Sequence, residues 1–361
     1  MSKIAIIHEY LVSYGGAEKT FRALSEIFPD AELYTLFYTP SILSKLKLGA
    51  GKRIKTSFLQ KFPLFLRKKY QLLLPFLPIA AETLDLREFD IVISASHSFA
   101  KGIITRPKTT HICYCFSPTR YLWDKARKNF LLHFFRIWDR QASERVDEFI
   151  ACSETVKQRI AKYYKRDSVV IYPPVDTRYK IQDTRYKHEF YLIVSQLRKY
   201  KRIDIAIEAF NKLGLELVII GEGQEKRRLK RKAEKNIKFL GWQPDEKVGE
   251  YYQNCTAFIF PSEDDFGIAP VEAMKYGKPV LAFRKGGALE TIIEGKTGEF
   301  FDYQNPAVLA DGVRRLRQNL ACRQADLKNY DPDFIKNHAQ QFSKERFAKE
   351  MKNFVDKMIK I

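Results

Sequence analysis

The stretch of sequence that decides the fold reads AFIFPSEDDFGIAPVEAMKYGKPVLA and covers residues 257–282. It contains a short apolar run at 257–260, a polar loop, a helix-forming segment at 270–276 and a second apolar run. Pro270 suits the first turn of a helix, and Gly277 suits its end. Short apolar runs that alternate with helical segments are typical of parallel α/β sheets, so this stretch predicts a strand–helix–strand unit of such a sheet.

The same alternation extends through the rest of the chain. We expect strands at 3–7, 32–38, 89–94, 110–114, 148–151, 169–172, 190–195, 215–220, 237–240, 257–260 and 279–282. Helices are expected at 17–28, from Ser153 to about 164, at 203–213, 225–236 and 270–276, and from about 287. Pro173-Pro174 and the polar residues up to His188 interrupt the pattern and read as a linker. The prediction is an α/β fold with two doubly wound domains, 1–173 and 174–335, followed by a helical segment at 336–361.

The composition excludes a disordered chain, and its unusual feature is a large excess of positive charge. Of 361 residues, 45% are hydrophobic, whereas 63 Lys and Arg against 43 Asp and Glu give a formal net charge of +20. This excess indicates an anionic partner, which is a nucleic acid, a phosphorylated small molecule or a membrane surface. Residues 4–7 are too few for a secretory signal, and we find no apolar run long enough for a bilayer. The five cysteines form no CxxC pair, so we expect a cytoplasmic protein.

One basic segment has no acidic residue. Between Leu33 and Ala81 there are nine Lys and Arg side chains, the first of which is Lys45, interleaved with large aromatic residues that include Phe58, Phe65 and Phe76. Basic and apolar residues in alternation suit a peripheral membrane surface, where each cation contributes about 1 kcal/mol near anionic lipid. This predicts association with the inner face of the cell membrane; the alternative is a core segment whose lysines are solvated.

The loop that follows the run at 257–260 has the chemistry of a ligand site. In an open α/β sheet, ligands bind beyond the carboxyl ends of the strands. The N–H groups of Gly267, Ile268 and Ala269 near a helix N-terminus suit phosphate or sugar hydroxyls. Glu272, expected in the first helical turn, can accept hydrogen bonds from a diol such as ribose; the alternative is that it caps its own helix. The residues alone therefore indicate a ligand with a diphosphate and a diol.

Several motifs in order resemble one enzyme family. They are Phe266 to Glu272, Gly277-Lys278-Pro279-Val280, Gly286 to Thr291 and Thr297-Gly298, and, in the first half, Gly15 to Glu18, Ser96 to Gly102 and Cys115 to Asp124. Together they resemble the retaining glycosyltransferases of family 4, and the last motif resembles the mannosyltransferase-like subset. The resemblance implies a GT-B fold, in which two Rossmann-like domains face each other across a cleft. It implies an acceptor domain at 1–173 and a nucleotide-sugar domain at 174–335. For the helical segment at 336–361 two alternatives stay open, a helix that belongs to the second domain or one that packs back on the first.

The resemblance also implies roles for residues of the second domain. The family's acidic pair, separated by seven residues, falls on Asp264 and Glu272; the glutamate binds ribose hydroxyls, and Asp264 stands where glutamate is usual. The family's phosphate-binding Arg and Lys fall on Gln196 and Lys201. Lys201 keeps the positive charge that contacts the diphosphate. Gln196 is uncharged where the family has arginine, so Arg198 or Lys199 of the same loop takes the place of that arginine. Phe266, Gly267 and Ile268 complete the donor-binding set.

In the first domain the implied roles fall on two loops. Gly15 and Gly16 let the backbone approach the diphosphate, a role that needs no side chain. His97 lies beside the transferred sugar, so the predicted catalytic residues are His97, Asp264 and Glu272; a purely structural His97 is the alternative.

The predicted reaction needs no metal and no cofactor besides the nucleotide-diphosphate sugar. Transfer develops positive charge on the anomeric carbon and negative charge on the leaving diphosphate. Lys201, helix N–H groups and the Gly16 backbone would stabilise the leaving group. No Asp-x-Asp pair stands at a strand end, so metal independence is predicted. The anomeric configuration is retained either by front-face attack or through a covalent intermediate, and the sequence leaves both alternatives open.

The resemblance favours GDP-mannose as donor and a lipid-linked or cell-surface glycan, such as lipopolysaccharide, as acceptor. A UDP-sugar is the alternative donor. A basic nucleic-acid-binding protein is the remote alternative, suggested by the net charge alone; no nucleic-acid partner is expected.

Overall fold

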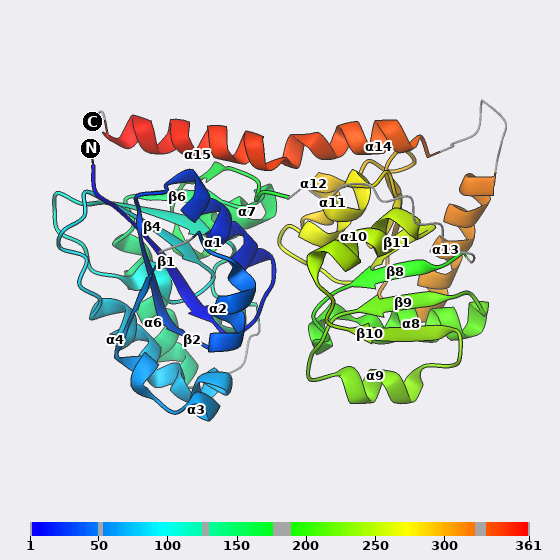
Figure 1. Ribbon diagram of the computed structural model, residues 1–361, viewed down its shortest axis with the longest axis horizontal. Helices are drawn as coiled ribbons and strands as arrows, with labels where there is room; N and C mark the ends of the chain where they lie inside the picture. Colours follow the sequence, from blue (N-terminus) through cyan, green and yellow to red (C-terminus); the bar gives the residue numbers. More distant parts are fainter. Residues whose placement is uncertain (1, 50–52, 125–129, 176–188, 322–329, 360–361) are drawn as a thin grey trace. The chain divides into compact units, whose positions relative to one another are not determined.

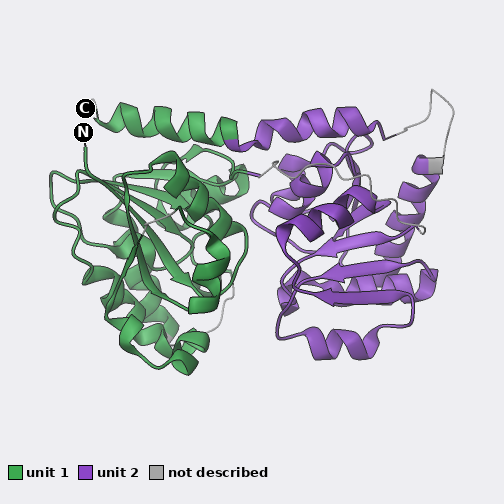
Figure 2. Cartoon of the chain, in the orientation of Figure 1, with its two compact units in different colours: residues 1–174, 345–361 green, residues 175–344 purple. Residues whose placement is uncertain are grey.

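The computed structural model describes the chain except for residues 1, 50–52, 125–129, 176–188, 322–329 and 360–361. The described chain divides into two compact units (Figure 2). Unit 1 comprises residues 1–174 and 345–361, and unit 2 comprises residues 175–344. The chain therefore passes between the units twice.

Unit 1 is built on a parallel sheet. Its seven strands within the described residues are β1 (Ile4–Leu11), β2 (Glu32–Tyr38), β3 (Ile54–Thr56), β4 (Ile91–Ser96), β5 (Thr110–Cys115), β6 (Glu148–Ala151) and β7 (Val169–Val170). They lie in the order β3-β2-β1-β4-β5-β6-β7, and all adjacent pairs are parallel. The strand order reverses between β1 and β4, which is where open sheets of this kind bind ligands.

Helices cover this sheet (Figure 1). They are α1 (Gly16–Ile27), α2 (Pro40–Leu46), α3 (Leu64–Lys68), α4 (Leu77–Glu82), α5 (Arg120–Trp123), α6 (Phe130–Glu144), α7 (Glu154–Tyr164) and α15 (Lys344–Ile359), with 3-10 turns η1 (Phe58–Lys61), η2 (Tyr70–Phe76) and η3 (Ala100–Gly102). Phe21 and Leu24 on one face of α1 are buried in the core. Ser153 caps α7 as predicted, because its hydroxyl accepts from the Val156 N–H at 3.1 Å.

Unit 2 repeats the plan with six parallel strands in its described part. They are β8 (Tyr191–Val194), β9 (Leu217–Ile220), β10 (Ile237–Gly241), β11 (Ala257–Phe260), β12 (Val280–Phe283) and β13 (Gly298–Phe301), in the order β10-β9-β8-β11-β12-β13. The order reverses between β8 and β11. The helices are α8 (Ile203–Leu213), α9 (Lys226–Lys232), α10 (Asp245–Asn254), α11 (Ile268–Lys275), α12 (Ala288–Thr291), α13 (Pro306–Ala321) and α14 (Pro332–Ala339), with η4 (Lys199–Lys201) and η5 (Gln340–Phe342).

The predicted α/β class with doubly wound sheets is confirmed, but the bounds of several elements differ from expectation. The strand expected at 3–7 runs from Ile4 to Leu11, and the one expected at 169–172 covers only Val169–Val170. Two helices differ as well. The helix expected at 225–236 ends at Lys232, because Ala233 adopts an extended backbone. The helix expected at 270–276 begins at Ile268, because Gly267 adopts the left-handed conformation that starts it. Glu272 is therefore its fifth residue and lies in the second turn, so the expected place in the first turn was wrong.

The C-terminal helix α15 packs within unit 1. Its Phe347, Met351 and Val355 are buried, and the Phe347 ring lies 5.7 Å from that of Tyr114 on β5. The guanidinium of Arg346 donates to the Tyr172 carbonyl at 2.7 Å. Unit 2 thus continues to Lys344 rather than ending at residue 335. In the described part of the chain, we find no helix with the length and apolar character to cross a bilayer.

Candidate active site

An ion pair marks the reversal point of the unit 2 sheet. Lys201, at the end of η4, follows β8, and Asp264 follows β11. The Lys201 ammonium donates to Asp264 Oδ2. The Asp264 Oδ1 atom is buried and accepts no hydrogen bond from the described residues. Lys201 and Asp264, both predicted to contact the donor sugar nucleotide, are thus brought together although they are 63 positions apart in the sequence. The Oδ1 atom of Asp264 is available to accept a hydrogen bond from a ligand.

Two glycines after β12 hold the Asp264 loop in place. Gly287 donates its N–H to the Asp264 carbonyl at 2.9 Å. A Cβ atom on Gly286 would lie 2.3 Å from that carbonyl oxygen, and one on Gly287 would lie 2.3 Å from the Phe266 Cα. Any side chain at these positions would therefore displace the loop that carries Asp264.

The start of α11 presents backbone N–H groups rather than the Phe266 side chain. Gly267 has φ +86° and serves as N-cap, and Ile268 is the first helical residue. The Phe266 ring is buried, 5.6 Å from the ring of Phe342. Of the three predicted donor-binding residues, Gly267 and Ile268 offer N–H groups, whereas the Phe266 side chain serves the core of unit 2.

Glu272 has a partner that sequence reasoning missed. Its Oε2 accepts from the hydroxyl of Tyr252 on α10 at 2.9 Å. Tyr252 is buried, and burial together with the adjacent Glu272 charge raises the pKa of its phenol well above the ordinary value. The phenol is therefore a permanent donor that orients the Glu272 carboxylate.

The other predicted donor residues lie on the loop after β8. Gln196 accepts from the Arg198 N–H at 2.9 Å through its carbonyl, so both residues lie in one tight turn before Lys201. Leu197 between them is buried and donates its N–H to the Glu222 carbonyl at 2.9 Å. The loops after β8 and β9 therefore support each other beside Lys201.

In unit 1 the predicted residues lie at the corresponding reversal point. Gly15, with extended backbone, is the N-cap of α1, and Gly16 is its first residue. His97 follows β4, partly buried, with its ring 6.2 Å from that of His8 and 5.5 Å from that of Tyr10. Burial lowers the pKa of His97 below its ordinary value. Residues 96–99 are called the His97 loop below.

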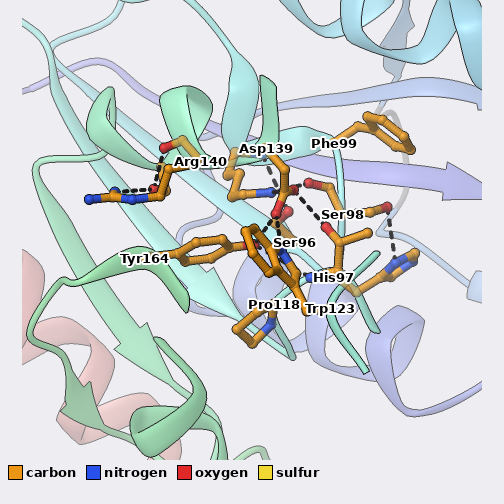
Figure 3. A network of polar contacts seen from close by, with 12 residues as sticks. Ser96, His97, Ser98, Phe99, Pro118, Trp123, Asp139, Arg140 and Tyr164 are labelled. Carbon is orange, nitrogen blue, oxygen red and sulfur yellow. Dashed lines mark hydrogen bonds and ion pairs between the residues drawn. The ribbon is translucent and has the colours of Figure 1, made fainter. Parts of the chain in front are cut away.

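A buried polar network lies next to the His97 loop (Figure 3). The Lys101 ammonium donates to the Ser98 carbonyl and lies 2.5 Å from Asp139 Oδ1 on α6. Both side chains of this ion pair are almost completely buried. Asp139 also accepts hydrogen bonds from Thr119 (2.7 Å), Trp123 (2.7 Å) and Tyr164 (2.9 Å). This carboxylate therefore joins the His97 loop to the segment after β5, and no sequence spacing indicated it.

No cluster of three or more His, Cys, Asp or Glu side chains suited to a metal ion occurs among the described residues. His111 of β5 is a core residue, because its Nε2 lies 2.8 Å from the Ser94 hydroxyl and burial lowers its pKa to about 4. Metal independence stays a prediction.

Doubly wound units with polar side chains gathered at their reversal points define a class of α/β enzymes that bind ligands at those points. Residues 14–179 match the family described as Glycosyltransferase Family 4, and residues 176–333 match Glycosyl transferases group 1. The chain therefore belongs to the group 1 glycosyltransferases of GT-B type.

Solved structures agree on the fold. HepE of Anabaena, in complex with UDP-glucose, matches with a TM-score of 0.74 and 17% identity over 99% of this chain and 100% of its own. Sucrose-phosphate synthase of Thermosynechococcus elongatus matches with a TM-score of 0.75 and 16% identity over 98% and 99%. At such identities the likeness concerns the fold alone.

Curated relatives are glycosyltransferases. An uncharacterized glycosyltransferase, MJ1178 of Methanocaldococcus jannaschii, is 28% identical over 51% of this chain and 53% of its own length. D-rhamnosyltransferase WbpZ of Pseudomonas aeruginosa is 27% identical over 55% and 58%. The chain thus spans little more than half the length of these two. Alpha-1,3/1,6-mannosyltransferase ALG2 of Kluyveromyces lactis is 24% identical over 99% of this chain and 85% of its own.

Proposed function

We propose that the chain transfers a hexose from a nucleotide-diphosphate sugar that unit 2 binds. The observation that carries the proposal is the Lys201–Asp264 pair at the reversal of the sheet. Lys201 meets the diphosphate, and the unpaired Oδ1 of Asp264 accepts from a sugar hydroxyl. The N–H groups of Gly267 and Ile268 add donors for the phosphate, and Glu272 accepts from the ribose diol.

Catalysis in this proposal is stabilisation of the leaving diphosphate. Negative charge that develops on the phosphate oxygens is met by Lys201, by the start of α11 and by the backbone at Gly15 and Gly16. His97 lies beside the transferred sugar. The anomeric configuration is retained and no metal is needed; NMR of the product anomer and activity in excess EDTA test these two points. An inverted product, or full loss of activity that Mg²⁺ restores, would reject them.

The favoured donor is GDP-mannose. Its support is the name of the ALG2 relatives, which are mannosyltransferases. The alternative, a UDP-hexose, has the support of HepE, whose structure contains UDP-glucose. Thermal-shift titration with GDP, UDP and ADP, followed by turnover of GDP-mannose and UDP-glucose, distinguishes them. Stabilisation by UDP but not by GDP would overturn the mannose assignment.

The acceptor is proposed to be a lipid-linked or surface glycan, reached at the inner face of the membrane. Support comes from the segment 58–79, whose large apolar side chains are unusually exposed: Phe58, Leu64, Phe65, Leu72, Phe76 and Ile79. Lys61, Lys68 and Lys69 of the same segment are exposed as well. Apolar side chains among cations favour an anionic lipid surface.

Two basic residues of the wider acid-free stretch have internal roles. Lys55 pairs with Glu32, and Arg67 donates to the Phe62 carbonyl at 3.0 Å and to the Tyr38 carbonyl. The membrane proposal therefore rests on Lys61, Lys68 and Lys69 and the apolar residues.

Liposome flotation tests this proposal. The wild type is expected to float with anionic vesicles and to be released by salt, whereas Phe65→Ser combined with Leu72→Ser weakens binding. Ile104→Ser, which changes an exposed apolar residue of unit 1 outside the segment, is the matched control. Absence of wild-type binding to anionic vesicles would reject the membrane role.

A nucleic-acid partner is not proposed, although α9 is strongly basic. Lys226, Arg228 and Lys232, three of the six cations on this described helix, pair with acidic residues of unit 2. Paired cations contribute little to phosphate binding. Salt-dependent binding to RNA or DNA with a sequence preference would favour the alternative.

A further inference from the structure

The carboxylate of Glu9, on β1, holds the His97 loop. Glu9 is fully buried. Its Oε1 accepts from the Ser96 hydroxyl (2.7 Å) and from the N–H groups of His97 (2.9 Å) and Ser98 (2.7 Å). Its Oε2 accepts from the Ser98 hydroxyl (3.2 Å) and the Phe99 N–H (2.8 Å). One side chain thus contacts all four residues of the loop.

Glu9 is negatively charged at neutral pH in spite of its burial. Burial raises the pKa of the carboxyl, but the neighbouring His97 and the hydrogen bonds from the loop outweigh it and lower the pKa to about 2. A buried carboxylate is costly unless its oxygens are satisfied, and here donors surround both of them. Charge-assisted hydrogen bonds of this kind are stronger than neutral ones, so the loop is held in one conformation.

The Ser98 hydroxyl connects this carboxylate to the imidazole ring. Its Oγ lies 3.3 Å from His97 Nδ1. Figure 3 marks this contact by a dashed line. Ionised Glu9 only accepts, so the single hydroxyl hydrogen of Ser98 is donated to Glu9. The Ser98 oxygen then accepts from His97 Nδ1–H. In the neutral ring this leaves Nε2 as the acceptor nitrogen.

We propose that Glu9 is the positioning residue of His97. Through Ser98 it keeps the proton on Nδ1 and presents Nε2 as an acceptor for a hydroxyl of the substrate. This inference rests on the proposed function, in which His97 lies beside the transferred sugar. No bond of the substrate is made or broken in this contact, because His97 only accepts a hydrogen bond.

Three charged or titratable groups among the described residues act on His97. Glu9 and Glu18, the latter from α1, raise its pKa, whereas His8 on β1 lowers it further together with burial. Removing the charge of Glu9 is therefore expected to lower the pKa of His97.

Two variants distinguish the hydrogen-bond link from Glu9 through Ser98 to the His97 ring from the support that Glu9 gives to the backbone of the His97 loop. Glu9→Gln keeps the size of the side chain, but its NH₂ group cannot accept from the loop donors, so both functions are weakened. Ser98→Ala keeps the contacts of Glu9 with the three N–H groups and removes the connection. Glu299→Gln is the matched control, since Glu299 is a buried carboxylate of unit 2 that accepts from Tyr330 (2.7 Å) and Asn319 (3.0 Å).

The experiment combines NMR of the full chain, labelled with ¹⁵N-histidine, with steady-state kinetics. The His97 signal is assigned by its loss in His97→Gln. We expect the Nδ1–H tautomer in the wild type, a mixture of tautomers in Glu9→Gln and Ser98→Ala, and a lower His97 pKa in Glu9→Gln. We also expect kcat to fall about 10- to 100-fold in both variants, with the donor KM within about twofold. Glu299→Gln is expected to lower Tm and to leave the His97 signal unchanged.

A folded Glu9→Gln protein that keeps the wild-type tautomer and pKa of His97 would overturn the proposal. Ser98→Ala gives the same test if Glu9→Gln does not fold. The NMR readout needs no sugar transfer, so failure of the proposed function is recognised separately. Full activity of His97→Gln would reject the proposed contact between His97 and the sugar. The role assigned to Glu9 in catalysis would then be rejected too, whichever tautomer of His97 the NMR spectrum shows.

Discussion

Glu9 and Asp264 lie near the reversal points of the two sheets, Glu9 on β1 and Asp264 in the loop after β11, and they differ in how their oxygens are satisfied. Each contacts segments at the reversal point of its sheet. Glu9 is fully buried, and both of its oxygens accept hydrogen bonds from the neighbouring loop. The Asp264 side chain is 18% exposed, with one oxygen on Lys201 and the other unpaired. A satisfied carboxylate supports the backbone, whereas a half-satisfied one still has capacity for a ligand.

The largest effect is expected from the cation of the unit 2 pair. Lys201→Gln should lower kcat/KM about 10²- to 10³-fold, because it removes charge stabilisation of the leaving diphosphate. Steady-state kinetics with the nucleotide sugar measure this. Lys212→Gln, on the exposed end of α8, is the control and should stay within about twofold of wild type. Retention of full activity by Lys201→Gln would break the assignment of unit 2 as the donor unit.

Acid should weaken unit 1 through Glu9. The pKa of Glu9 is lowered from 4.5 to about 2, so its contribution is present above pH 4.5 and is lost as the pH falls from 4.5 towards 2. We expect a loss of about 3 kcal/mol in the free energy of unfolding across this window. Urea unfolding at a series of pH values measures it, and Glu9→Gln should flatten the curve below pH 4.5.

His111 acts in a separate pH window and serves as the internal control. Its pKa is lowered from 6.5 to about 4, so it weakens the fold as the pH falls from 6.5 to 4. His111→Asn should remove that part of the curve and leave the part below pH 4 intact. An unchanged acid limb in Glu9→Gln would contradict the role of this carboxylate in stability.

A smaller effect is expected at the orienting partner of Glu272. Tyr252→Phe removes the hydrogen bond to Oε2 and keeps the ring in the core. The dissociation constant of the nucleoside diphosphate should rise about 3- to 10-fold, which corresponds to a hydrogen bond of about 1 kcal/mol. Calorimetric titration measures it. Tyr251→Phe, at the neighbouring position, is the control, and equal effects of both changes would point to α10 packing instead.

The smallest effect is expected when Asp264 is lengthened. Asp264→Glu adds one methylene, so it should keep the pair with Lys201 and change the donor KM less than about threefold. Competition kinetics between two donor sugars is the sensitive measurement, because the unpaired oxygen is the one proposed to contact the sugar. A loss as large as that of Lys201→Gln would mean that the geometry of this pair, rather than its charge, is decisive.

Many elements and site residues could be predicted from the sequence, but their exact bounds and partners could not. Strands such as β2, β6 and β11 were predicted to the residue, because their apolar runs are bounded by polar or turn-forming neighbours. His97 and Asp264 were expected in the loops after strands and lie there, whereas Gly15 and Gly16 lie at the start of α1, after a strand that continues to Leu11. The place of Glu272 was missed by a turn, because the left-handed Gly267 begins α11 earlier than Pro270 suggested.

The sequence by itself determined the α/β class and the place of many strands and helices along the chain, since hydrophobic periodicity and turn chemistry act over a few neighbouring positions. Only the tertiary structure decided which of these residues meet. Glu9 contacts residues 87 to 90 positions away, and Lys101 meets Asp139 across 38 positions. Such contacts depend on strand order and on the loops at the carboxyl edge of the sheet. Buried polar groups take whatever partners that arrangement offers, and no local pattern records the choice.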